Sequence, residues 1–116
     1  MDKNYPEKEI KLSQPEISAL KKMIFYIKFS CFEEESIFFS GSYSINSILK
    51  KIINADDFSF WSKNIYCQVD KEKDVFIKDK ISKYMDDHRI SNEEKQELYE
   101  QCLYPYKIDL GEEGDK

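Results

Sequence analysis

The carboxylates that could bind a metal ion are Asp70, Glu72 and Asp74, which alternate like the first ligands of a calcium-binding loop. Such a loop needs a glycine at its sixth position and a bidentate glutamate at its twelfth. Those positions here hold Val75 and Ile81. We therefore interpret the three acids as a solvated joint between helices, and we expect neither a metal site nor a cofactor.

A second candidate for chemistry is the run Asp86-Asp87-His88, which could act as an acid/base pair or bind a metal. Neighbouring residues on a helix point about 100° apart, so the two aspartates do not aim at one shared ion. His88 also continues an apolar helical stripe that includes Ile77 and Ile81. A histidine in that position usually packs at the helix end. We expect no enzyme; the rival hypothesis is an enzyme that uses His88 with cysteine or aspartate partners.

The three cysteines give little support to nucleophilic or redox chemistry. Cys31, Cys67 and Cys102 are far apart, odd in number and not arranged as a CxxC pair. Each lies beside apolar or aromatic residues, so we expect buried thiols in a reducing, cytoplasmic setting. Gly41 is the only glycine between residues 16 and 104, which excludes a glycine-rich phosphate loop.

Acids and tyrosines near the carboxyl end are the more informative pattern. Tyrosine is enriched at the centres of protein interfaces, and carboxylates around it would attract a basic partner. The same pattern also fits an ordinary solvated helix whose tyrosines are in the core. The residues that we assign to a protein-binding surface are Asp86, Asp87, Glu93, Glu97, Glu100, Tyr104 and Tyr106.

Charge narrows the kind of partner. The 116-residue chain has a formal net charge of −5, and Arg89 is the only arginine among its 18 basic residues. Because arginine is the better side chain for phosphate and base contacts, we expect no direct nucleic-acid binding. Residues 56–116 hold 10 basic and 16 acidic side chains, so −6 of the charge lies there. We therefore expect a basic protein partner that meets the second half of the chain.

The stretch 17–32 must lie at the centre of the fold. Ile17, Leu20 and Ile24 begin one apolar stripe at helical spacing, and Phe25 and Phe29 belong to a second stripe on the other side. A helix that is apolar on two sides has to be packed between other elements. The same residues also alternate as in a strand, so a short hairpin over 23–43 is the alternative.

Capping signals predict where the helices begin. Ser13 with Glu16, and Ser91 with Glu94, have the spacing of capping boxes. The first helix would end near Glu33 or continue to Gly41. We expect Ser44 to cap a helix over 45–53, a short segment over 58–69, and a further helix over 73–87. Pro105 should stop the last helix.

These elements predict a single domain over residues 1–116, with an extended lead-in over 1–12 and an acidic tail over 107–116. The expected fold class is all-α, an irregular bundle of four to five helices, and the alternative is α+β. No apolar run reaches the about 18 residues that a membrane span needs, and no signal peptide is visible.

The expected function is that of a small acidic protein-binding inhibitor. Its most specific form is a bacterial immunity protein that covers the active surface of a basic, nuclease-like toxin. A phage-type inhibitor of a host defence protein and a helical subunit or adaptor of a larger assembly are the alternatives.

Overall fold

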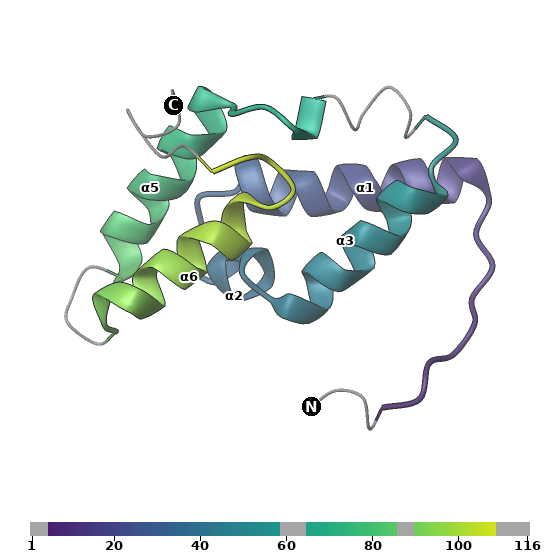
Figure 1. The fold of residues 1–116 in the computed structure, drawn as a ribbon, viewed down its shortest axis with the longest axis horizontal. Helices are drawn as coiled ribbons and strands as arrows, with labels where there is room; N and C mark the ends of the chain where they lie inside the picture. Colours follow the sequence, from purple (N-terminus) through teal and green to yellow (C-terminus); the bar gives the residue numbers. More distant parts are fainter. Residues whose placement is uncertain (1–4, 59–64, 86–89, 109–116) are drawn as a thin grey trace.

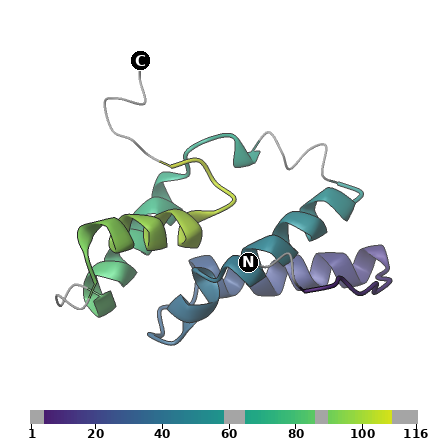
Figure 2. The same cartoon turned by 60° about the horizontal axis from the view of Figure 1, so that its bottom comes forward.

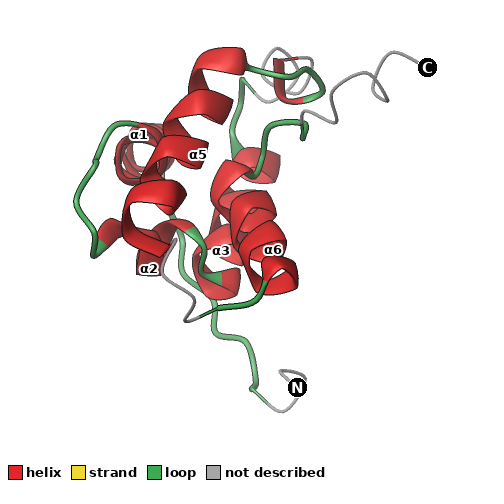
Figure 3. Cartoon of the chain, turned by 90° about the vertical axis from the view of Figure 1, so that its left-hand side faces the viewer, coloured by secondary structure: helices red, strands yellow, loops and turns green. Residues whose placement is uncertain are grey.

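A computed structural model describes residues 5–58, 65–85 and 90–108, which form five helices and no strand (Figure 3). The all-α expectation is confirmed, and the α+β alternative with a hairpin over 23–43 is wrong. The five helices, with their bounds, are α1 (Gln14–Phe29), α2 (Ser36–Ser40), α3 (Tyr43–Ala55), α5 (Lys71–Met85) and α6 (Asn92–Leu103).

The central helix α1 begins with the expected capping box. The Glu16 amide donates to the Ser13 hydroxyl, and the Ser13 amide donates to the Glu16 carboxylate. The helix ends earlier than either expected boundary, because the amides of Ser30 and Cys31 both donate to the carbonyl of Tyr26. The chain then turns through the three glutamates into the short helix α2.

The helix α3 begins at a different serine from the one expected. The Ser42 hydroxyl accepts a hydrogen bond of 3.2 Å from the Ile45 amide, so Ser42 is the N-cap. Ser44 lies inside the first turn and is exposed. Both serines are possible caps by residue type, and the position at which the chain leaves α2 decides between them.

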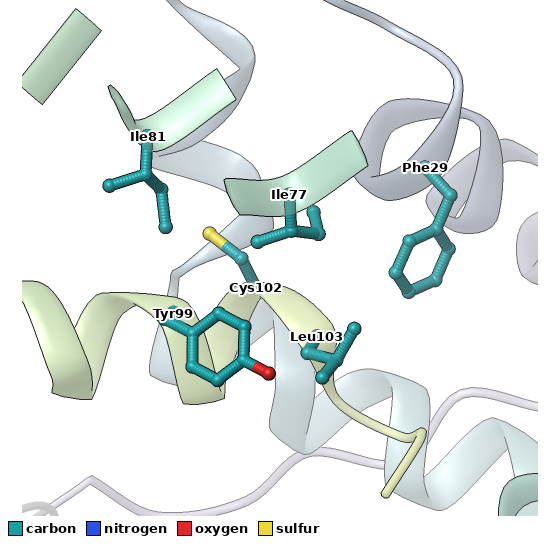
Figure 4. Packing of buried hydrophobic residues seen from close by; sticks show 6 residues of the cluster. All are labelled: Phe29, Ile77, Ile81, Tyr99, Cys102 and Leu103. Carbon is teal, nitrogen blue, oxygen red and sulfur yellow. The ribbon is translucent and has the colours of Figure 1, made fainter. Parts of the chain in front are cut away.

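Two apolar clusters flank α1, as its two stripes predict. One cluster joins α1 to α3 through Ile17, Ile24 and Leu49. The other joins Phe29 to α5 and α6. Figure 4 shows Ile77 and Ile81 of α5 above Tyr99, Cys102 and Leu103 of α6, with Phe29 to one side. In Figure 1 and Figure 2, α5 and α6 accordingly form one group and α1 with α3 the other.

Two lysines are buried where helices end, a burial that the sequence patterns did not predict. Lys28 is fully buried, and its Nζ donates to the Ser40 carbonyl at 2.7 Å, to Asn46 Oδ1 at 2.8 Å and to the Gln101 carbonyl at 2.9 Å. Lys80 donates to the Cys31 carbonyl at 2.6 Å. Lys28 therefore binds carbonyls in the last turns of α2 and α6, and Lys80 binds a carbonyl just beyond the end of α1. The helix dipole favours a positive charge near such an end.

Other expectations are met in part. The helix expected over 73–87 begins at Lys71, and the last helix has the expected Ser91–Glu94 capping box. Residues 5–12 are non-helical and exposed, whereas the tail beyond residue 108 lies outside the described residues. Cys102 is buried as expected, but Cys67 is exposed. Over the described residues, no helix is both long enough and apolar enough to cross a bilayer.

Candidate protein-binding surface

The three glutamates assigned to α6 share one side of that helix. Glu93 and Glu97 are exposed and Glu100 is partly exposed. Glu97 also accepts a hydrogen bond from the hydroxyl of Tyr43, the first residue of α3. This bond raises the pKa of Tyr43 above its usual value. The structure thus adds an exposed tyrosine to the acidic side of α6.

The two tyrosines assigned to the surface pack inward to a large extent. Tyr104 lies against the cluster between α1 and α3. The ring of Tyr106 lies 5.4 Å from that of Phe29 and 5.4 Å from that of Tyr66, both edge-on. Burial raises the pKa of Tyr106 to about 12, with Tyr66 and Asp70 adding to the effect. Both rings are partly buried, while Asp86 and Asp87 lie outside the described residues.

The segment that leads through α2 into α3 also exposes rings and acids, and we call these residues, together with Glu97, the acidic–aromatic face. Phe38 is 65% exposed, Phe39 54% and Tyr43 66%. Three glutamates immediately precede α2, and all are exposed. The residues that define the face are Glu33, Glu34, Glu35, Phe38, Phe39, Tyr43 and Glu97.

The shortness of α2 explains why its phenylalanines face outward. A helix of five residues has little more than one turn, so only a few of its side chains can point into the core. Ile37 is 1% exposed, and Ser36 and Ser40 are also buried. Phe38 and Phe39 are left on the outer side. The sequence does contain two adjacent phenylalanines shortly after three acids, a pattern that fits an exposed segment. No local pattern, however, shows which of the apolar residues of α2 turn inward.

A small apolar pocket lies beside this face. Phe39 lines it together with Met23, Ile27 and Ile45, and its volume is about 200 Å³. Met23 is itself 53% exposed. Exposed apolar groups that adjoin one another, with a polar rim, are typical of protein-binding surfaces.

Catalytic chemistry gains no support from the part of the chain that is described. No group of three or more histidine, cysteine or carboxylate residues there could hold a metal ion. Burial raises the pKa of Cys102 to about 11, although Lys28 and Lys80 oppose the shift. Its thiol is therefore protonated at neutral pH and is not an activated nucleophile.

Buried charge in the described residues has a structural role instead. Burial lowers the pKa of Lys28 to about 8, against a raising effect from Cys102 and with a further lowering from Lys80. No buried side-chain nitrogen or oxygen in the described ranges lacks a hydrogen-bond partner. Lys28 could have been suspected from sequence, since it continues the stripe of Ile17 and Ile24 at helical spacing.

Comparisons with known proteins return no relative. No protein-family model matches the chain, and no significant match is found among curated proteins or among solved structures.

Proposed function

We propose that this protein is a small acidic inhibitor that binds and neutralises a basic protein through its acidic–aromatic face. The most specific form of the proposal is a cytoplasmic immunity protein for a bacterial nuclease-like toxin. The single observation that supports it is the exposure of Phe38 and Phe39 next to the three glutamates before α2. Phage-type inhibition of a host defence protein would use the same surface.

The two kinds of side chain on this face would have separate roles. Phe38, Phe39 and Tyr43 are large rings whose burial against a partner would supply most of the affinity. The pocket of about 200 Å³ beside Phe39 would receive one apolar side chain of that partner. Glu33, Glu34 and their neighbours would mainly accelerate encounter with a basic surface and select against acidic ones.

The experiment that tests this proposal compares substitutions on and off the face. The partner is the product of the neighbouring gene, purified as a toxin candidate. We expect Phe38→Ser with Phe39→Ser to weaken both binding and toxin inhibition at least tenfold, about 1.4 kcal/mol or more. Val75→Ser is the matched control, because Val75 is 55% exposed but lies on α5. Unchanged inhibition by the double variant would refute the proposed face.

A second candidate function is that of a subunit or adaptor in a larger assembly. It is favoured by an apolar groove of about 770 Å³ between residues 8–12, α1 and α3, which Ile10, Leu12 and Ile48 help to line. Lys8 and Lys51 also line this groove, so it does not suit a basic partner. Size-exclusion chromatography across concentrations distinguishes the two functions, since only the assembly subunit should form a concentration-dependent oligomer.

A further inference from the structure

We propose that a cleft between α1 and α5 binds a nucleoside monophosphate, with Lys22 on its phosphate and Tyr26 on its base. The cleft has a volume of about 390 Å³, within the range of small-molecule sites. The lining residues that the argument uses are Lys21, Lys22, Phe25, Tyr26, Lys73 and Tyr106. It is separate from the acidic–aromatic face, because the pocket of that face is lined by other residues of α1.

The rings in the cleft are suited to a planar ligand. The ring centroids of Phe25 and Phe29 are 5.6 Å apart and edge-on, and that of Tyr106 lies 6.1 Å from that of Phe25. These three rings pack against one another and form the wall of the cleft. Tyr26 is 60% exposed. A purine or pyrimidine gains from stacking on such a ring whatever its identity, since every base has a π-face.

The lysines give the cleft a positive charge in a chain that is acidic as a whole. Lys21 pairs with Asp56, and Lys73 pairs with Asp70 at 3.2 Å. Lys73 Nζ also lies 5.2 Å from the centroid of the Tyr106 ring. No carboxylate in the described ranges is paired with Lys22. The ammonium of Lys22 is therefore available to bind an anionic ligand in the cleft.

The spacing along α1 places the ammonium of Lys22 beside the ring of Tyr26. Lys22 and Tyr26 are four residues apart on one helix, so their side chains are neighbours on the same side. A phosphate held by Lys22 and a base stacked on Tyr26 would be joined by a single ribose. A polynucleotide would meet the net charge of −5 beyond the cleft, which favours a free mononucleotide over a strand.

The test is calorimetric titration of the full chain, at low salt, with adenosine monophosphate, adenosine and ribose 5-phosphate in turn. We expect adenosine monophosphate to bind at least ten times more tightly than either fragment. Equal binding of ribose 5-phosphate would overturn the proposal, because it would show an anion site without stacking. Absence of saturable binding by adenosine monophosphate would overturn it as well.

Matched variants locate the binding in the cleft. Lys22→Glu and Tyr26→Ala should each weaken adenosine monophosphate binding at least tenfold, and both residues are exposed, so the fold should persist by circular dichroism. Lys50→Glu on α3 and Tyr43→Ala on the acidic–aromatic face should change the affinity less than twofold. An equal loss in the control variants would refute the assignment to this cleft.

Discussion

At the scale of single residues, two buried ammonium groups, those of Lys28 and Lys80, bind neutral oxygens from several helices. Lys28 Nζ makes three hydrogen bonds to neutral oxygens from α2, α3 and α6. A lysine ammonium has three N–H donors, so every one of them is satisfied. The carbonyls of Ser40 and Gln101 come from the last turns of their helices and would otherwise have few partners.

Removing this ammonium should destabilise the fold. In Lys28→Met, the Ser40 carbonyl loses the donor described here, whereas the Gln101 carbonyl keeps a hydrogen bond of 2.9 Å from Asn46. We expect the free energy of unfolding to fall by about 2–4 kcal/mol, measured by urea denaturation. Lys50→Met, at an exposed position of α3, should change it by less than about 0.5 kcal/mol. A loss no larger than in that control would contradict the role given to Lys28.

The same lysine should make stability depend on pH. Its pKa is lowered to about 8 in the fold and is about 10.5 in the unfolded chain. Between these values the unfolded chain binds more protons, so the free energy of unfolding rises as pH increases. We expect a gain of about 1 kcal/mol from pH 7 to pH 9 by urea denaturation. In Lys28→Met this rise should be much smaller.

Above pH 9 two other groups oppose the gain from Lys28, which continues to about pH 10.5. Burial raises the pKa of Cys102 from 9.0 to about 11 and that of Tyr106 from 10.0 to about 12. Each group then holds its proton more tightly in the fold than in the unfolded chain, so its contribution to stability falls as pH rises between the two values. A steady gain in stability from pH 9 to pH 11 would contradict these assignments.

At the scale of elements, the caps determine where helices begin, and tertiary contacts determine which cap is used. Ser13 and Ser91 each complete a capping box that sequence spacing alone identifies. Ser42 and Ser44 are indistinguishable by type, and the structure selects Ser42. Gly41 also matters because α6 approaches it closely, and a Cβ there would lie 2.6 Å from Leu98 Cδ1.

The choice of cap can be measured. Ser42→Ala removes the acceptor for the Ile45 amide and should lower the free energy of unfolding by about 1 kcal/mol. Ser44→Ala alters an exposed position inside the first turn and should change it by less than about 0.5 kcal/mol. The reverse order in thermal or urea denaturation would show that Ser44 is the cap.

At the scale of the whole molecule, the acids of the proposed binding face come from both halves of the sequence. The second half holds the excess of acids, yet the face with exposed rings takes three glutamates from the first half and Glu97 from the second. α2, which follows the three glutamates, contacts α6, and Tyr43 at the start of α3 donates a hydrogen bond to Glu97 of α6. For the proposed function, the electrostatic surface is therefore a property of the fold and not of either half.

This arrangement predicts how salt affects binding to a basic partner. Rising ionic strength should slow association strongly and change dissociation little, as measured by stopped-flow or surface plasmon resonance. Replacing Glu33, Glu34 and Glu35 by glutamine should lower the association rate constant about three- to tenfold at low salt. Replacing Glu7 and Glu9, which are exposed in the lead-in, should have less effect. An association rate independent of salt would refute the electrostatic role.

The sequence by itself determined what depends on neighbours along the chain. Helical periodicity and two capping boxes predicted an all-α fold around a helix that is apolar on two sides. These signals are readable because hydrogen bonds and side-chain spacing within a helix involve residues three or four positions apart.

Only the tertiary structure decided which side chains are covered. Lys28 lies on the apolar stripe of α1, but lysine is usually a surface residue. Lys28 and Lys80 can be buried because carbonyls distant in sequence converge on them. Phe38 and Phe39 are exposed because the one turn of α2 is filled on its inner side by Ile37 and two serines. Tyr106, assigned to a binding surface, is partly buried, and its ring lies edge-on to those of Phe29 and Tyr66. Burial depends on how separate helices meet, which no local pattern contains.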